Sequence, residues 1–399
     1  MTRKFRFGAG IAAAGLIFGA PAAAQDAPGQ WFSFAPDKLA APYATPGVDN
    51  HSELVPRPPG VLPQVPKGFA IEAYVTGLSN PRFMALAPDG DVFVTESNAN
   101  RITRIRDGKA STFATGFHYP SGIAFHDGAL YVGDLNAVWR IAYKDGAATA
   151  GRRRRVTRDG FGGTAGHKTR DIAFGPDGTL YLAIGSADNV GEDAAPRATV
   201  QVVDADGHLS RFAAGTRNPV GIAVEPGAGT LFVTVNERDG LGDDLPPDYF
   251  TSVGRGDFFG WPYAYIGKHP DPEFGPKRPD MVAKTRAPDV LFHAHSAPLG
   301  FAFYDGAQFP AEYRGDAFVA LHGSWDAARP EGYKVVRIKF ANGKAENGYE
   351  NFVTGFWASG TTPPKVWGRP CGILVDKDGS LLIADDAGNT IWRVRYTGQ

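Results

Sequence analysis

The sequence predicts an all-β protein, a six-bladed β-propeller, on three observations. A pattern of one apolar strand, a turn with Gly or Asp-Gly, and a second apolar strand recurs six times in the 399 residues. The 51 glycines, 31 prolines and 12% aromatic residues are typical of many strands joined by many turns. The spacing between successive recurrences is close to the length of a propeller blade, roughly 40–50 residues. We therefore expect six blades stacked around a channel.

Each recurrence is expected to form a β-hairpin, because Asp-Gly readily adopts the positive φ angles of a tight turn. The paired segments are 84–90 with 92–95, 123–128 with 130–132, 172–178 with 180–183, 222–227 with 231–234, 301–306 with 317–320, and 373–379 with 381–384. Outer strands with one wet face are expected at 102–105, 138–141, 333–338 and 390–394. A jelly roll or sandwich is the rival fold, but neither explains the regular hairpins. We predict one domain, residues 67–397.

The first 24 residues have the layout of a secretory signal. Cations within residues 3–6 precede an apolar run at 7–18, and small residues end at Ala24. This run is shorter than the roughly 20 residues of a membrane-spanning helix. We therefore expect cleavage after Ala24 and a periplasmic or secreted protein without a membrane span. Residues 25–66, rich in Pro, Ala and Gly, are expected to form an irregular lead-in.

Charge and cysteine content exclude several classes of protein. Lys plus Arg number 41 and Asp plus Glu number 42, a balance that lacks the basic field of a nucleic-acid-binding protein. Cys371 is the single cysteine. It excludes an internal disulfide, a thiolate zinc finger, a Cys-ligated Fe–S cluster and the attachment site of c-type haem. Any redox chemistry must therefore use another cofactor.

The most informative candidate residues lie just before predicted strands. His167 precedes the strand at 172–174, Arg217 has the equivalent position in the next blade, and Arg369 has it in the last blade. Such positions face the mouth of a propeller, where a histidine can act as general base and arginines can bind a multiply carboxylated ligand. A hydrogen-bonded structural histidine is the alternative. The stretch 236–244 offers oxygen donors that Ca²⁺ prefers, or it is an ordinary acidic loop.

Two further motifs are weaker candidates. Four consecutive arginines, 152–155, could grip an anion, although such runs are more often solvated turns between strands. His293 and His295 fall on one face of a strand, as a metal pair would, but no third ligand is apparent.

From about residue 66 onward the chain resembles the soluble glucose/sorbosone dehydrogenase family. The resemblance is strongest at 167–185, 215–218, 236–244, 260–262, 322–325, 332–337 and Arg369. Members of this family are six-bladed propellers that use pyrroloquinoline quinone (PQQ) with Ca²⁺. The stretches 322–325 and 332–337 look closest to the sorbosone-dehydrogenase-like branch.

The resemblance implies a role for each matching residue. His167 would take the hydroxyl proton of the sugar while hydride passes to the quinone. The cofactor-binding residues would be Arg217, Asn218 and Arg369, with Arg329 as the cation nearest to the family's cofactor-binding lysine. The metal-binding residues would be Asp239 and Gly240 through their backbone oxygens, with Asp243 and Asp244 near a structural calcium.

The chain also departs from the family pattern. Ser186 stands where the glucose enzyme has an Asp behind the histidine, with Asp188 nearby as a substitute, and Cys371 aligns with an arginine of the cofactor clamp. The expected activity is PQQ- and Ca²⁺-dependent oxidation of an aldose or aldehyde sugar, sorbosone-like, with electrons passed to an external quinone or cytochrome. Two alternatives remain open: a Ca²⁺-dependent propeller lactonase, which needs carboxylates from several blades, and a binding propeller without activity.

Overall fold

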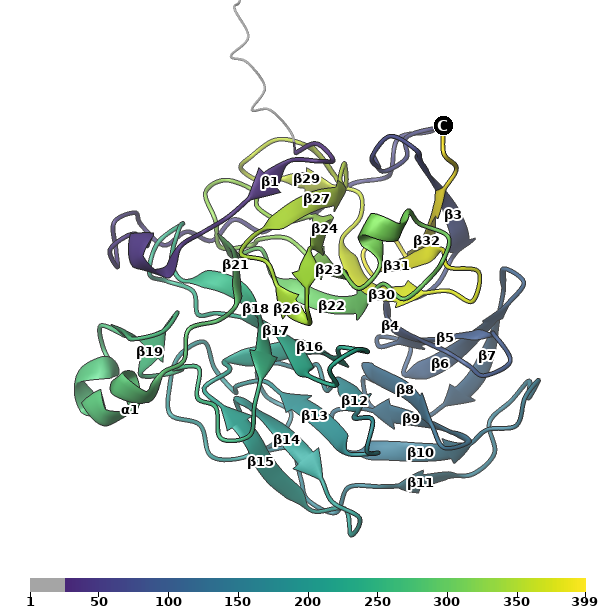
Figure 1. The fold of residues 1–399 in the computed structure, drawn as a ribbon, viewed down its shortest axis with the longest axis horizontal. Coiled ribbons are helices and arrows are strands. Elements are labelled where there is room, and N and C mark those ends of the chain that lie inside the picture. The colour runs from purple at the N-terminus through teal and green to yellow at the C-terminus, as the bar shows by residue number, and fades with distance from the viewer. Residues whose placement is uncertain (1–25) are drawn as a thin grey trace, which may run out of the picture.

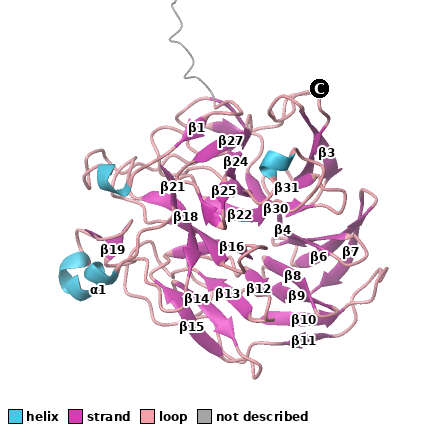
Figure 2. Ribbon diagram, in the orientation of Figure 1, coloured by secondary structure: helices cyan, strands magenta, loops and turns pink. Residues whose placement is uncertain are grey.

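The structure is a computed structural model that describes residues 26–399, so the predicted signal sequence lies outside the described residues. Strands dominate this part of the chain (Figure 2). Its helical elements are α1 (Pro279–Lys284) and the 3-10 helices η1 (Pro36–Lys38), η2 (Gly275–Lys277) and η3 (Ala311–Tyr313). None of the helices in residues 26–399 is long and apolar enough to cross a membrane. The prediction of an all-β protein is confirmed.

Within residues 26–399, six antiparallel sheets have four or five strands each (Figure 1). The first contains β4 (Pro81–Leu86), β5 (Val92–Glu96), β6 (Arg101–Arg106) and β7 (Lys109–Thr115), and the second β8 (Gly122–His126), β9 (Ala129–Gly133), β10 (Val138–Ala142) and β11 (Arg153–Arg155). The third contains β12 (Ile172–Phe174), β13 (Leu180–Ile184), β14 (Thr199–Val203) and β15 (Leu209–Ala214), and the fourth β16 (Asn218–Val224), β17 (Leu231–Asn236), β18 (Pro247–Val253) and β21 (Val290–Ala294).

The last two large sheets are completed by strands from the N-terminal part of the chain. The fifth contains β22 (Pro298–Phe303), β23 (Ala317–Leu321), β24 (Lys334–Ile338), β27 (Tyr349–Val353) and β1 (Trp31–Phe32). The sixth contains β30 (Pro370–Val375), β31 (Leu381–Asp385), β32 (Thr390–Tyr396) and β3 (Phe69–Thr76). Small sheets form from β2 (Glu53–Leu54), β28 (Trp357–Ser359) and β29 (Lys365–Val366), from β19 (Ala264–Tyr265) and β20 (His269–Pro270), and from β25 (Phe340–Ala341) and β26 (Lys344–Ala345).

The first strands of the six sheets follow one another in a cycle. In turn β4, β8, β12, β16, β22 and β30 each contact the next, and β30 contacts β4. Glycines permit this close approach: a Cβ at Gly122 would collide with the carbonyl oxygen of Arg170, and one at Gly372 with that of Arg82. Backbone therefore packs on backbone where the first strands of neighbouring sheets meet.

The core lies between neighbouring sheets. Phe232 of β17 stacks on Phe250 of β18, with ring centroids 5.0 Å apart, and meets Phe303 of β22 edge-on at 5.6 Å. All three rings are buried. Each sheet thus buries apolar side chains against the next sheet, which the isolated hairpins could not do.

The irregular segment 26–66 ties together two long loops. The hydroxyl oxygen of Thr45 accepts a hydrogen bond from the backbone N–H of Asp243 at 2.8 Å. Asn50 Nδ2 donates to the Ala327 carbonyl at 2.8 Å. The loops that follow β17 and β23 are therefore positioned partly by residues far away in sequence.

Candidate active site

A cavity of about 350 Å³ lies at the end of the ring where the first strands begin. His167, Arg217, Asn218 and Arg369 line it together, although they come from three different sheets. Arg82 of β4 adds a side chain from a fourth sheet. The positions that precede the predicted strands therefore meet in one hollow.

His167 presents one unpartnered ring nitrogen. Its Nδ1 lies 3.0 Å from the Ser186 carbonyl oxygen and 3.0 Å from Ser186 Oγ, which itself donates to the Asp188 carbonyl at 2.7 Å. Nδ1–H therefore donates to the Ser186 carbonyl, and the Nε2 lone pair has no hydrogen-bond partner in residues 26–399. Burial, and then the charge of Arg217, lower the pKa of His167 to about 3. The imidazole is neutral and able to accept a proton at Nε2.

Asp188 does not support His167 with its carboxylate. Its side chain is exposed, and it contributes only the backbone carbonyl that accepts from Ser186 Oγ. The imidazole is thus oriented by the Ser186 hydroxyl and by two backbone carbonyls, and not by the Asp188 carboxylate, which was the expected substitute for the aspartate of the glucose enzyme.

All five N–H groups of Arg217 face protein acceptors. Nε donates to the Asn189 carbonyl at 2.8 Å, and Nη1 donates to the Asn236 and Glu237 carbonyls at 3.2 and 2.6 Å. Nη2 donates to Asn189 Oδ1 at 3.0 Å and to Asp239 Oδ2 at 3.5 Å. In this arrangement Arg217 joins the loops after β13 and β17 and places a positive charge beside His167. Its guanidinium has no N–H group left to donate to a ligand.

Arg369 and Asn218, by contrast, retain polar atoms for a ligand. Arg369 donates from Nε to the His322 carbonyl at 3.0 Å and from Nη2 to the Gly323 carbonyl at 2.6 Å, and its Nη1 has no partner in the described part of the chain. Asn218 is buried, and its Oδ1 is among the described buried atoms without a hydrogen bond. A buried acceptor without a partner is costly, so these atoms favour occupation by a polar ligand.

His322 also lines the cavity, and Asp386 pairs with it, although neither residue was predicted as part of the site. His322 Nε2 donates to Asp386 Oδ1 at 2.8 Å, and Arg82 Nη1 donates to Asp386 Oδ2 at 2.8 Å. Burial, and then the charge of Arg369, lower the pKa of His322 to about 4. Burial opposes ionisation of Asp386, but the His322 hydrogen bond and the charges of Arg82 and Arg369 hold its pKa below its usual range. His322, a second neutral imidazole, therefore lines the cavity.

His295 forms an ion pair in the cavity and is not part of a metal pair. Its Nδ1 lies 3.1 Å from Asp239 Oδ1, and its Nε2 lies 3.0 Å from the Gly242 carbonyl. Burial opposes the charge, but the hydrogen bonds to Asp239 and Gly242 raise the pKa of His295 to about 9. His293 instead packs edge-on against Phe34, with centroids 4.6 Å apart. The two imidazoles therefore do not share a ligand.

The residues expected to bind Ca²⁺ do not fit that ion as they are arranged. The Asp239 carbonyl accepts hydrogen bonds from Asn189 Nδ2 and Arg238 Nε, both at 3.2 Å, and the Asp239 carboxylate already faces two cationic side chains. Gly240 and Asp244 are exposed, and none of Gly240, Asp243 and Asp244 lines the cavity. The described residues contain no group of three or more His, Cys, Asp or Glu that could hold a metal ion.

Arg329 lies outside the cavity, contrary to the expectation that it replaces a cofactor-binding lysine. It is exposed, because its loop is held by other segments: Asp243 Oδ1 accepts from the Ala328 N–H at 3.0 Å, and Asn50 holds the Ala327 carbonyl. His322, at the start of the same loop, lies in the cavity instead. The signal in the sequence was its position two residues after the end of the predicted strand 317–320.

Comparisons with families and single proteins give consistent matches. The model of a family described as TrAA12-like matches residues 63–245 and 277–397. The model described as Glucose / Sorbosone dehydrogenase matches residues 192–329, which confirms the resemblance seen in the sequence. An uncharacterised protein of Borreliella burgdorferi is 28% identical over 351 residues, 84% of this chain and 90% of that protein.

Several solved structures share the fold. A Trichoderma reesei carbohydrate-active enzyme of family AA12 has a TM-score of 0.72 and 21% identity, covering 87% of this chain and 100% of that one. The PQQ domain of Coprinopsis cinerea pyranose dehydrogenase has a TM-score of 0.69 and 21% identity, covering 84% and 98%. The aldose sugar dehydrogenase of Escherichia coli has a TM-score of 0.63 and 17% identity, covering 82% and 99%. The TrAA12-like match extends over well more than half of the sequence, and the chain belongs to the TrAA12-like family.

Proposed function

We propose that this protein is a PQQ-dependent dehydrogenase that oxidises an aldose or an aldehyde sugar of the sorbosone kind. The observation that carries the proposal is one cavity lined by a neutral histidine base and by unpartnered polar atoms from several sheets. The match to the glucose/sorbosone dehydrogenase model supports it. The similar structures of the PQQ domain of Coprinopsis cinerea pyranose dehydrogenase and of the PQQ-bound aldose sugar dehydrogenase of Streptomyces coelicolor support it as well.

The wider architecture forms part of the same proposal. We take the six large sheets of residues 67–397 as the blades of a six-bladed β-propeller, and the cycle of contacts among their first strands supports this. The pattern of residues 1–24 supports export to the periplasm or the medium. Electrons would then leave to an external quinone or cytochrome.

The cavity fits PQQ in size and in chemistry. Its volume of about 350 Å³ is within the roughly 300–1,000 Å³ of small-molecule sites. Arg369 Nη1 would donate to a carboxylate or carbonyl of the cofactor, and Asn218 would do so through its Nδ2 group, which bonds Asn236 Oδ1 at only 3.5 Å. Asn218 Oδ1 is an acceptor and suits a hydroxyl or N–H donor of a ligand. Lys168 adds positive charge nearby. Bound PQQ would supply the hydride acceptor, while the protein orients the reactants and handles the proton.

His167 would handle that proton. Its Nε2 accepts the proton of the sugar hydroxyl, and the Ser186 carbonyl holds the Nδ1–H on the opposite side of the ring. Burial, and then the charge of Arg217, lower the pKa of His167 and keep its imidazole neutral. A carboxylated ligand would offset the positive charge of Arg217 and raise the pKa of His167 toward its ordinary range, which strengthens the base. No step is assigned to Ca²⁺, since the Asp239 carbonyl expected to bind it accepts from two protein N–H groups, and Gly240, Asp243 and Asp244 do not line the cavity.

A Ca²⁺-dependent lactonase is the less favoured function. It needs free, ionised carboxylates at the cavity, but Asp239 faces His295 and Arg217, and both Asp248 oxygens accept backbone N–H groups. Glu237 also lines the cavity, but burial raises its pKa to about 8, so this carboxyl is uncharged at neutral pH. A binding protein without activity is the remaining outcome of the test.

The test combines cofactor binding with turnover. Purified protein would be titrated with PQQ, followed by tryptophan fluorescence, and then assayed with aldoses and aldehyde sugars and an artificial dye acceptor, with and without added Ca²⁺. Saturable PQQ binding and sugar-dependent dye reduction are expected. Hydrolysis of sugar lactones without PQQ would indicate the lactonase. If the protein neither binds PQQ nor hydrolyses lactones, both enzymatic functions are rejected.

A further inference from the structure

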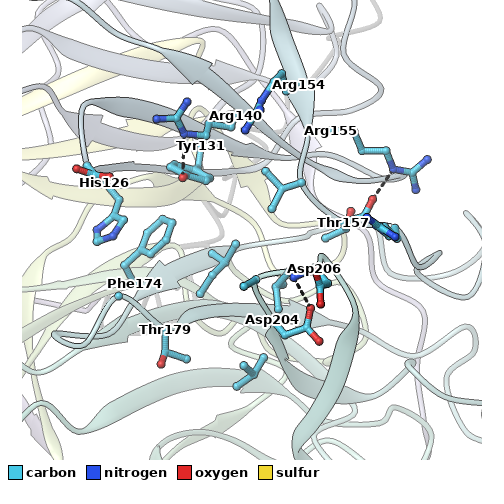
Figure 3. Close-up of a pocket in the computed structure, with 18 of the residues that line it drawn as sticks. His126, Tyr131, Arg140, Arg154, Arg155, Thr157, Phe174, Thr179, Asp204 and Asp206 are labelled. Atoms are coloured by element: carbon cyan, nitrogen blue, oxygen red, sulfur yellow. Dashed lines mark hydrogen bonds between the residues drawn. The ribbon is translucent and has the colours of Figure 1, made fainter.

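A groove of about 1180 Å³ lies between the outer parts of the second and third sheets (Figure 3). It is formed by β9 to β11 and by the turns that follow β8, β12 and β14. The first strands β8 and β12 end at this groove, whereas the cavity described above lies where the first strands begin. The two sites therefore lie at opposite ends of the same strands, and the inference below does not rest on the proposed function.

One side of the groove carries four arginines without a counter-ion. Arg140, Arg154, Arg155 and Arg158 line it, and none of them forms an ion pair with a described carboxylate. Arg155 donates to backbone carbonyls, and Arg140 Nε donates to the Tyr131 hydroxyl at 3.1 Å. The guanidinium groups of Arg154 and Arg158 have no hydrogen-bond partner in residues 26–399. Half of the predicted basic run, Arg154 and Arg155, thus faces a concave surface.

The opposite side carries carboxylates that those arginines do not reach. Figure 3 shows Asp204 and Asp206 across the groove from Arg140 and Arg154. Asp204 Oδ1 accepts a hydrogen bond from the backbone N–H of Asp206 at 2.9 Å, while the Asp206 carboxylate accepts no hydrogen bond from the described residues. Cations and anions therefore face each other across a space wide enough for a ligand between them.

Aromatic rings line the groove at one end. Phe174 and His126 stack with centroids 4.0 Å apart and planes 9° apart, and Tyr131 meets Phe174 edge-on at 4.8 Å. All three rings are only half-buried, so their free surfaces are available to a flat apolar face. Aromatic rings combine such a face with polar edges, which suits a ligand that is apolar on one side and polar around its rim.

These three features point to one class of ligand. Arginine forks bind carboxylates with two parallel hydrogen bonds, ionised aspartates accept hydrogen bonds from hydroxyl groups, and aromatic faces pack on the C–H face of a pyranose ring. A polyphosphate would meet the arginines but has no hydroxyl donor to place at the aspartates opposite, where its charge is only repelled. A carboxylated oligosaccharide can place its carboxylates at the arginines and its hydroxyl groups at the aspartates. The volume exceeds the roughly 1,000 Å³ of the larger small-molecule sites, which favours an oligomer over a single sugar. We propose that this groove binds a carboxylated oligosaccharide.

The experiment measures binding of tetragalacturonate by isothermal titration calorimetry to the protein without PQQ. We expect saturable binding that the double variant R154A/R158A weakens about 10-fold or more, because it removes two charge-assisted contacts. Arg152→Ala is the matched control, since Arg152 belongs to the same run and is exposed but does not line the groove. It should leave the affinity within about twofold, because its exposed side chain does not line the groove and makes no direct contact with a ligand bound there.

Neutral and phosphate probes separate this proposal from general charge effects. Maltotetraose should bind at least about 10-fold more weakly than tetragalacturonate, because it lacks carboxylates. Asp206→Ala should weaken tetragalacturonate and strengthen tripolyphosphate, because it removes both a hydroxyl acceptor and a repulsive charge. The proposal fails if Arg152→Ala weakens binding as much as R154A/R158A, if maltotetraose binds equally well, or if tripolyphosphate binds wild-type protein more tightly than tetragalacturonate. Saturable binding that R154A/R158A weakens and Arg152→Ala does not would place the ligand in the groove.

Discussion

Replacing Asp386 by Asn should destabilise the fold far more than the loss of a surface charge. The Asp386 carboxylate accepts from Arg82 and His322, both at 2.8 Å, and the side chains of Arg82 and Asp386 are 9% and 6% exposed. Asn keeps the shape but not the charge, so the Arg82 guanidinium would stay buried without a counter-ion. Removal of one partner from a buried pair costs about 3–5 kcal/mol.

The assay is urea unfolding at pH 7, followed by tryptophan fluorescence and by circular dichroism. The midpoint should fall while the slope of free energy against urea stays constant, since the same surface is exposed on unfolding. Asp280→Asn is the matched control: Asp280 pairs with Arg278 at 2.9 Å, but the side chains of Asp280 and Arg278 are 52% and 46% exposed. Its loss should leave the midpoint unchanged within error.

A second variant separates the missing pair from a general disturbance. In R82M/D386N the unpaired buried charge is gone. The double variant should therefore lose clearly less stability than the sum of the losses measured for Arg82→Met and Asp386→Asn alone. Two results would refute the reasoning: a loss below about 1 kcal/mol for Asp386→Asn, or strictly additive losses in the double variant. Either would mean that water reaches Arg82 and replaces the carboxylate.

Further predictions concern single features of the site and ring. The pKa of His295 is raised to about 9, above its ordinary 6.5. Its pair with Asp239 should therefore stabilise the fold fully below about pH 6.5, and about 3 kcal/mol of that stability should be lost as the pH rises through 9. Urea unfolding at several pH values should show this dependence in the wild-type protein and not in His295→Gln. His167→Asn should lower turnover of PQQ-loaded protein by at least about 10² with PQQ affinity retained, and near-normal turnover would reject its role as base. Gly122→Ala should cost about 1–3 kcal/mol by overpacking, whereas Gly151→Ala, with open space around it, should not. Ca²⁺ added to PQQ-free protein should show no saturable heat of binding, and a stoichiometric site would contradict the account of Asp239.

The fold was predictable because it is encoded locally. Each Asp-Gly or Gly turn fixes one hairpin, and the segments predicted at 123–128 and 130–132 correspond to β8 and β9. His167, Arg217 and Arg369 were found by the same logic: they precede first strands, and all first strands begin at one end of the ring. Position relative to a repeated hairpin was sufficient, without knowledge of any long-range contact.

The parts of the site that could not be predicted lie on the long loops. Arg329 and Asp243 belong to loops whose paths depend on Asn50 and Thr45, some two hundred or more residues earlier in the chain. Nor could the sequence show that Arg217 has all its donors occupied, because its acceptors are mainly backbone carbonyls of other loops. Backbone acceptors exist at every residue, so the residue types carry no signal for such contacts.

The same hairpin logic, carried one step further, accounts for the residues that were missed. In an antiparallel hairpin the second strand ends where the first begins, so residues after the second strand reach the cavity end as well. Polar side chains stand at or within two residues of this position in all six large sheets of the described chain: Ser97, Asp134, Ser186, Glu237, His322 and Asp386. Ser186 orients His167, Asp386 pairs with Arg82 of the next sheet, and the His322 carbonyl accepts from Arg369 of the next sheet. Of these six residues, Glu237 and His322 line the cavity, while Ser186 and Asp386 hold side chains that do. The position after each second strand therefore contributes to the site together with the position before each first strand.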